Sequence, residues 1–237
     1  MRARGFCFVL VPGAGGSAWY WHLVAPRLRE GGHEAVPVEL PAADDRAGLP
    51  QYAAAVVRAI GKRDLRSVIL VAQSLAGFTA PLVCQKMPVA MLVLVNAMIP
   101  EPGETPGEWW GHTGQTEAKR QQNVRDGRKP DAPFDPLLDF FHDVPPPVVD
   151  DAWAQGEPRQ SDTVFGSPCA FKAWPTVPAR VLVGRDDRFF PAEFQRRVAR
   201  ERLGISADEM PGGHLVALSQ PAELSRRLVA YAAEHAP

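Results

Sequence analysis

Ser74 stands at a point where a buried strand runs directly into a helix. The strand is the apolar run 67–72, and the residues flanking the serine two positions away, Ala72 and Ala76, are both small. A sharp strand-to-helix turn of this kind lifts a serine hydroxyl above the edge of a sheet, and it leaves room only for small neighbours. The pattern predicts a nucleophilic serine. The alternative is that Ser74 only caps the helix, because serine is a favoured N-cap residue.

A serine hydroxyl needs a base within hydrogen-bond reach, and the base needs a carboxylate that orients it. His214 lies in a glycine loop between the last predicted strand and the last helix, and Asp186 and Asp187 follow the predicted strand 180–183. Loops that leave parallel strands meet at one edge of the sheet. We therefore expect His214 and one of the two aspartates beside Ser74. The alternative is that His214 only binds a backbone carbonyl in its loop.

A glycine-rich turn, residues 12–16, follows the first apolar run. Its backbone N–H groups could stabilise an oxyanion, and we expect the N–H of Ala14 to be one donor. The N–H of Leu75 is the second candidate, because it lies at the positive end of the helix that follows Ser74. A phosphate- or dinucleotide-binding loop is the competing interpretation, but neither of the glycine motifs typical of such loops is present.

The apolar runs alternate with helical patterns along most of the chain. The predicted strands are residues 6–11, 35–40, 67–72, 90–95, 180–183 and 205–210, and the predicted helices are 18–29, 51–60, 74–86, 192–202 and 221–235. Strands that are apolar on both faces are typical of a parallel sheet covered on both sides. The expected fold is α/β, with a mostly parallel sheet of about six strands and helices on both faces.

Residues 98–175 interrupt this alternation. The stretch 100–178 holds 13 of the 24 prolines and four of the six tryptophans. A structureless loop of such length is uncommon in a compact domain. We expect an inserted cap of short helices over the sheet, with residues 1–97 and 176–237 forming the core; the alternative is a partly disordered insertion.

Three aromatic residues suggest what the site accepts. Phe78 follows the serine turn closely, and Trp109 and Trp110 lie in the predicted cap. Ligand pockets are mostly lined by apolar and aromatic side chains, so these three are candidate contacts of a largely apolar substrate. Core packing is the commoner role of such residues.

The charge balance points to a small-molecule substrate. The chain has 26 basic and 27 acidic residues and a net charge of −1, which gives no electrostatic reason to expect nucleic acid or an anionic membrane. The apolar run 6–11 is too short for a signal peptide, and nothing approaches a membrane span of about 18 apolar residues, so we expect a cytoplasmic location.

The three cysteines and six histidines form no metal or disulfide pattern, and no cofactor is expected. Whether the chain forms a homodimer stays open.

Taken together, these segments resemble the α/β-hydrolase superfamily across nearly the whole chain, and within it the branch of plant-type methyl esterases and hydroxynitrile lyases with their bacterial relatives. The resemblance is carried by residues 11–19, by the spacing Gly184-x-x-Asp187-x-x-x-Pro191, and by residues 213–221. It implies Ser74 as nucleophile, His214 as base and Asp187, rather than Asp186, as the residue that orients it. It also implies Ala14 and Leu75 as oxyanion donors.

The sequence departs from that branch at three places. Pro12 replaces the customary histidine of the glycine turn, Gln73 replaces the usual histidine before the serine, and Leu215 stands where the lyases have a lysine. The last difference argues against cyanohydrin cleavage. The expected reaction is hydrolysis of a small, largely apolar ester, lactone or thioester through an acyl-enzyme. The alternatives are a lyase, decarboxylase or cyclase that uses the same pocket, and a ligand-binding receptor.

Overall fold

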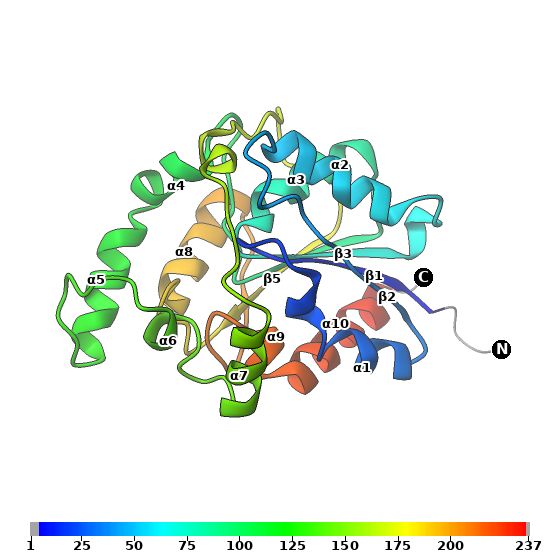
Figure 1. Cartoon of the computed structure of the whole chain (residues 1–237). Coiled ribbons are helices and arrows are strands. Elements are labelled where there is room, and N and C mark those ends of the chain that lie inside the picture. Colours follow the sequence, from blue (N-terminus) through cyan, green and yellow to red (C-terminus); the bar gives the residue numbers. More distant parts are fainter. Residues whose placement is uncertain (1–4, 236–237) are drawn as a thin grey trace.

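The computed structural model describes residues 5–235 and contains one sheet of six parallel strands (Figure 1). The strands are β1 (Cys7–Val11), β2 (Glu34–Pro37), β3 (Val68–Gln73), β4 (Met91–Val95), β5 (Ala179–Gly184) and β6 (Asp208–Met210), in the order β2-β1-β3-β4-β5-β6. Every residue of β1, β3 and β4 is buried, because helices cover both faces of the sheet. The predicted α/β class and strand number are confirmed.

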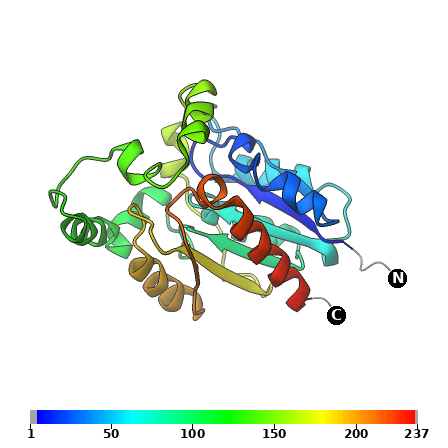
Figure 2. The same cartoon turned by 90° about the horizontal axis from the view of Figure 1, so that it is seen from below.

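Helices pack on both faces of the sheet, as Figures 1 and 2 show. One face is covered by α2 (Leu49–Ile60), α3 (Ala76–Lys86) and α8 (Ala192–Leu203), and the other by α1 (Ala25–Glu30), α9 (Val216–Ser219) and α10 (Pro221–His235). Two hydrophobic cores result. They fix the sheet firmly from both sides, so the loops at its carboxyl edge start from rigid supports.

Prolines account for two differences from the predicted boundaries. The predicted helix 18–29 is split into a 3-10 helix, η1 (Ala18–Trp21), and α1, whose first turn contains Pro26. Proline favours the first turn of a new helix and cannot continue an existing one. The second strand likewise ends at Pro37, three residues earlier than expected. A further 3-10 helix, η2 (Leu65–Ser67), precedes β3.

The segment predicted as the cap, residues 98–175, contains short helices beyond the carboxyl ends of the strands (Figure 1). They are α4 (Pro106–Thr113), α5 (Gln115–Arg125), α6 (Pro136–Asp139), α7 (Pro146–Ala154) and the 3-10 helix η3 (Asp162–Gly166). Three of these helices begin with proline, and Gly114 in the left-handed conformation separates α4 from α5. The proline content therefore gives many short helices in place of a few long ones.

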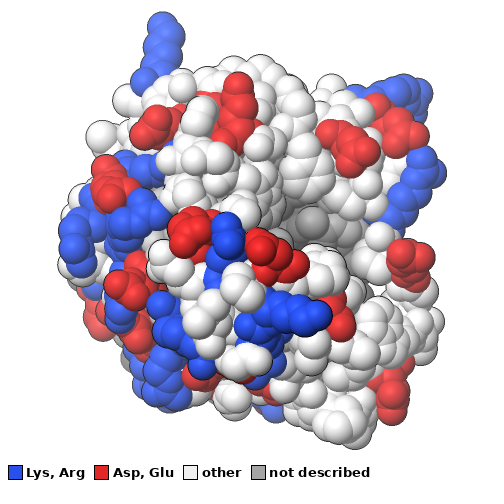
Figure 3. All heavy atoms as spheres, turned by 90° about the vertical axis from the view of Figure 1, so that its left-hand side faces the viewer, with Lys and Arg blue, Asp and Glu red and all other residues white. Residues whose placement is uncertain are grey.

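The surface around α5 and α8 carries both signs of charge. Figure 3 shows basic and acidic side chains interspersed on this face. A hollow between the two helices is lined by Arg125, Arg196 and Arg200, and also by Glu117 and Glu193. This face is therefore no single-signed patch. Within residues 5–235, the helices are all too short or too polar to cross a membrane.

Candidate functional site

Ser74 occupies a strained turn at the end of β3. Its backbone φ is 51°, in the left-handed region that few residues other than glycine adopt. The end of β4 holds the turn on two sides: the Ser74 N–H donates to the carbonyl of Val95 (3.2 Å), and the N–H of Met98 donates to the Ser74 carbonyl (3.0 Å). Helix α3 starts only at Ala76, with Leu75 as its N-cap residue. The helix-capping alternative for Ser74 is therefore wrong.

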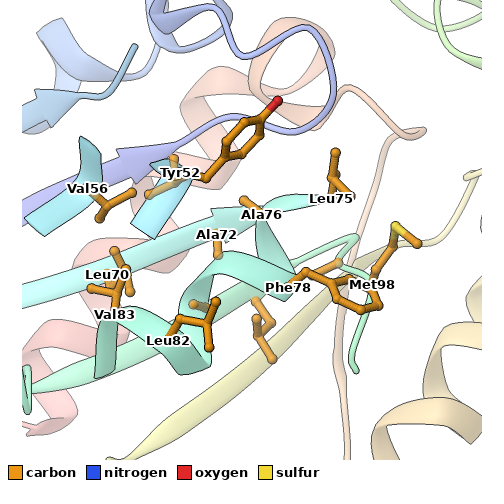
Figure 4. Packing of buried hydrophobic residues seen from close by; sticks show 14 of the residues in the cluster. Tyr52, Val56, Leu70, Ala72, Leu75, Ala76, Phe78, Leu82, Val83 and Met98 are labelled. Carbon is orange, nitrogen blue, oxygen red and sulfur yellow. The ribbon is translucent and has the colours of Figure 1, made fainter. Parts of the chain in front are cut away.

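Small residues are required around this turn because other backbone segments approach it closely. A Cβ added at Gly77 would overlap the backbone oxygen of Met98, and one added at Gly13 would lie 2.8 Å from the Ser74 Cβ. The sequence drew attention to Ala72 and Ala76, which are buried under the turn (Figure 4). The tightest approach is one residue further, at Gly77, which lets the β4 loop reach the serine.

His214 bridges the serine and one aspartate. Its Nε2 lies 3.0 Å from the Ser74 Oγ, and its Nδ1 lies 2.8 Å from Oδ2 of Asp187. With the ring proton on Nδ1, the imidazole donates to the carboxylate and its Nε2 can accept the serine proton. The side chains of His214 and Asp187 are 2% and 0% exposed, so water is excluded from the relay.

Asp187 is held by its own loop. Its Oδ1 accepts the backbone N–H groups of Phe189 (2.9 Å) and Phe190 (2.8 Å), and its Oδ2 also accepts from Gln195 (3.2 Å). The neighbouring Asp186 points elsewhere, is half-exposed and accepts the N–H of Gly212. The structure thus places beside His214 the same aspartate that the loop spacing had indicated. Sequence reasoning missed Gln195, for which no motif gives a signal.

Three phenyl rings surround the imidazole of His214. Phe140 from the cap stacks on it, with ring centroids 4.8 Å apart and 14° between the planes, and Phe189 and Phe190 meet it edge-on at 5.3 and 5.0 Å. Phe189 and Phe190 follow Asp187 in the chain, so their nearness could have been inferred from the acid loop. Phe140 carries no such signal, because its position depends on how the cap folds.

The three predicted substrate contacts lie at different depths. Phe78 is wholly buried in the core below the turn (Figure 4), and Trp109 is also buried, with its indole N–H donating to the carbonyl of Ile99. Trp110 is half-buried and contacts Phe189. Trp110 and Trp109 both contact Phe190, which meets the His214 ring, so each indole is separated from His214 by one ring. Phe78 and Trp109 are nevertheless buried as core residues.

The two predicted oxyanion donors are free to donate to a ligand atom. Among residues 5–235, no hydrogen-bond acceptor pairs with the backbone N–H of Ala14 or Leu75. The next N–H, that of Gly15, donates to Oε1 of Gln160 in the cap (2.9 Å), and the N–H of Gly13 donates to Oε1 of Gln73 (3.0 Å). The glycine turn is thus fixed on both sides of Ala14. The role of these donors stays a prediction.

The cysteines offer no second nucleophile. Cys7, Cys84 and Cys169 are buried thiols, and burial raises the pKa of each to about 12. A thiol is nucleophilic only as the thiolate, so all three stay unreactive near neutral pH. In the part of the chain that the structure describes, no group of three or more His, Cys, Asp or Glu side chains could hold a metal ion.

Comparison with known proteins agrees with this geometry. Residues 8–227 match the model of the alpha/beta hydrolase family. The probable esterase PIR7A of Oryza sativa subsp. indica is 25% identical, covering 99% of this chain and 100% of the relative, and Methylesterase 3 of Arabidopsis thaliana is 28% identical over 53% of this chain and 52% of its own. The crystal structure of polyneuridine aldehyde esterase has a TM-score of 0.76 at 22% identity, covering 96% of this chain and 99% of that one. The resemblance to plant-type methyl esterases is confirmed, and the chain belongs to the alpha/beta hydrolase family.

Proposed function

We propose that the chain is a serine hydrolase that cleaves a small, largely apolar ester, lactone or thioester through an acyl-enzyme. The observation that carries the proposal is the position of the His214 imidazole, 3.0 Å from the Ser74 oxygen and 2.8 Å from the Asp187 carboxylate. Hydroxyl, imidazole and carboxylate at these distances are the arrangement that nucleophilic acyl transfer requires.

The first half of the reaction forms the acyl-enzyme. His214 Nε2 takes the proton of Ser74 as Oγ attacks the substrate carbonyl, and the imidazolium is stabilised by Asp187. The N–H groups of Leu75 and Ala14 would bind the oxyanion; losing one such donor typically costs about 10²–10³ in rate. The tetrahedral intermediate then collapses, and the leaving alcohol or thiol receives the proton from His214.

The second half releases the acid. Water gives a proton to His214 Nε2 and attacks the acyl carbonyl, and a second tetrahedral intermediate forms in the same oxyanion site. Its collapse breaks the bond to Ser74 Oγ, which recovers its proton from His214. The burial of Asp187 supports this cycle, because an ion pair that is shielded from water stabilises the imidazolium more strongly.

Two further observations support the substrate class. Relatives within the family are named esterases, which supports an ester bond as the one cleaved. The rings of Phe140 and Phe189 against His214, with Trp110 behind them, support an apolar group near the reacting carbonyl.

A serine-reactive fluorophosphonate probe and p-nitrophenyl acetate test the proposal. We expect labelling of the wild-type chain at Ser74, and turnover that falls roughly 10⁶-fold in Ser74→Ala. Ser225→Ala is the matched control, since Ser225 donates to the Pro221 carbonyl within α10 and not to a triad residue. If neither reagent reacts with the wild type, the hydrolase proposal is wrong. Labelling together with only non-hydrolytic turnover of natural substrates would favour a lyase, decarboxylase or cyclase.

A further inference from the structure

The three triad residues follow β3, β5 and β6, and no triad residue follows β4. Ser74 follows β3, Asp187 follows β5 and His214 follows β6, whereas β4 lies between β3 and β5 and supplies no member. The residue that follows β4 is Asn96. Asn96 is completely buried. Its backbone φ is 44°, and in the described chain Ser74 is the one other residue apart from glycine with a positive φ.

Every hydrogen bond of the Asn96 side chain goes to a loop that carries a triad member. Its Oδ1 accepts the N–H of Gly184, where the Asp187 loop begins (2.6 Å). Its Nδ2 donates to the carbonyls of Gly213 (2.9 Å) and His214 (3.1 Å). One amide group therefore joins the loop of the acid to the loop of the base.

The backbone on either side of Asn96 holds the nucleophile as well. Val95 accepts the Ser74 N–H, and Met98 donates to the Ser74 carbonyl. The turn 95–98 thus touches the serine loop through its main chain and the two other loops through the Asn96 amide. No other short segment described above contacts all three loops.

An asparagine suits this position for two physical reasons. Asparagine tolerates the left-handed backbone conformation better than most residues, because its short polar side chain can bond locally. Its amide is also both an acceptor and a double donor, which matches one N–H and two carbonyls. An aspartate would have the same shape, but its second oxygen would face the carbonyls of Gly213 and His214 with no proton to donate.

The backbone of Gly213 and His214 is held from other sides too. The Gly213 N–H donates to Oδ2 of Asp143 in the cap (2.6 Å), and Gln73 donates a longer bond to the His214 carbonyl (3.4 Å). Asn96 is the only one of these residues that reaches both carbonyls and also the acid loop. Its loss would free the His214 backbone relative to Asp187 and Ser74 together.

We infer that Asn96 is a positioning residue, which holds the His214 imidazole in register with both Asp187 and Ser74. The inference rests on the proposed function for its kinetic consequence, but its structural part stands on the three hydrogen bonds of the Asn96 amide. A small displacement between reacting groups can cost about 10²-fold in rate, so an effect of this size is expected although Asn96 touches no reacting atom.

Kinetics of three variants test the inference. Asn96→Gly keeps a backbone that tolerates positive φ but removes all three bonds, and Asn96→Asp keeps the shape and the acceptor but loses both donors. Asn123→Ala is the control: Asn123 is equally buried and donates to one carbonyl, that of Pro130, within the cap. Turnover is measured per serine that a fluorophosphonate titrates, so misfolded protein does not contribute.

We expect kcat per titrated serine to fall about 10²-fold in Asn96→Gly, with KM little changed, because binding is separate from the orientation of the base. Asn96→Asp should not restore kcat. An Asn96→Gly enzyme that keeps the kcat of the Asn123→Ala control would overturn the inference. Wild-type chain that neither labels nor turns over an ester would instead overturn the proposed function.

Proton NMR tests whether Asn96 positions the imidazole even if the wild-type chain has no esterase activity. Proton NMR should show a strongly downfield resonance from the His214 Nδ1 proton, which is shared with Asp187 over 2.8 Å. We expect this resonance to shift or broaden in Asn96→Gly and to stay unchanged in Asn123→Ala. An identical resonance in wild type and Asn96→Gly would show that the Asn96 amide does not position the imidazole.

Discussion

The loops at the sheet edge and the cap are held in different ways. In the loops, the turn that follows β4 fixes the candidate residues: the main chain of Val95 and Met98 holds Ser74, and the buried Asn96 amide holds the other two loops. The cap meets these loops largely through side chains, such as Gln160 on Gly15 and Asp143 on Gly213. The reacting groups therefore depend on the sheet, which tolerates little change, whereas the surroundings of the substrate depend on side chains that can be exchanged one at a time.

The cap also has a polar centre of its own. Asp139, at the end of α6, is completely buried and binds Lys119 (2.9 Å) and Arg128 (2.8 Å). The next residue is Phe140, whose ring stacks on His214. All the large hydrophobic side chains that are exposed in the described chain also lie in the cap: Val124, Phe134, Leu137, Leu138 and Trp153. Of these exposed side chains, Phe134 contacts Phe140 (4.9 Å between ring centroids), so two rings beside the ion cluster lead from the surface to the imidazole.

Among the variants that compare the loops with the cap, Asp187→Asn should have the largest effect, and it tests the loops. The amide cannot stabilise the imidazolium and favours the wrong tautomer of His214, so kcat should fall about 10⁴-fold with the fold intact. Ester turnover measures the loss of kcat, and the thermal midpoint of unfolding shows whether the fold is intact. Asp186→Asn is the control, because its remaining oxygen can still accept the Gly212 N–H; equal losses in both variants would contradict the assigned roles.

The contrast also explains what the sequence could predict. Strands β1 and β4 are continuous apolar runs, and β3 and β5 contain the apolar runs 68–72 and 181–183. Both faces of the sheet are buried at these runs, and the pattern is local. Ser74 and Asp187 follow strands of this kind within a few positions, and His214 follows the short edge strand β6. Once the strands are parallel, their ends must share one edge, so Ser74, Asp187 and His214 could be placed together without any coordinates.

Other contributors could not be found in this way, because their roles depend on the register between distant segments. In the sequence, Asn96 is only a polar residue after a strand, because its partners Gly184 and Gly213 are distant in the chain and meet it only in the folded structure. Phe140 reaches His214 only through the path of the cap, whose prolines reveal short helices but not their directions. Trp109 stood out by its residue type, although it packs as core.

Gly77→Ala tests how tightly the loops are packed. Its Cβ would overlap the Met98 backbone oxygen, which cannot rotate away as a side chain could. We expect the free energy of unfolding to fall by more than about 3 kcal/mol, beyond the usual cost of overpacking. Urea denaturation measures the loss. Wild-type stability in this variant would show that the β4 loop moves freely, and the contrast between rigid loops and adaptable cap would then fail.

Asp139→Asn tests the cap. It leaves Lys119 and Arg128 without their buried partner, and breaking such a pair typically costs about 3 kcal/mol or more. Because this ion cluster lies entirely within the cap, we expect the cap to open locally before the sheet unfolds. Faster amide hydrogen exchange in α5 and α6 would show this opening. Asp131→Asn, whose carboxylate is exposed and pairs with Arg120, is the control and should change little.

Acid should have the same effect on the cap as this variant. Burial acts to raise the pKa of Asp139, but the hydrogen bonds from Arg128, the Asp135 N–H and Lys119 outweigh it, so the net pKa is lowered. A carboxyl with a lowered folded-state pKa contributes stability above its unfolded value, about 3.9, and loses that contribution as the pH falls through the folded value. In the wild type, protection of α5 and α6 from exchange, measured relative to the intrinsic rate at each pH, should therefore fall below about pH 4. An Asp139→Asn variant with the same acid response as wild type would exclude Asp139 as the cause.

Gly111→Ala should have the smallest effect, with the opposite sign to Gly77→Ala. Gly111 lies exposed inside α4, and a Cβ there would meet no atom within 4 Å. Alanine in a helix interior is favoured over glycine by roughly 0.5–1 kcal/mol, because glycine loses more conformational entropy on folding. The same substitution should therefore raise the thermal midpoint in the cap and lower it in the loops, with kcat unchanged for Gly111→Ala. A loss of stability at Gly111 would mean that α4 is packed as tightly as the serine turn, and the two regions would then not differ in their tolerance of added atoms.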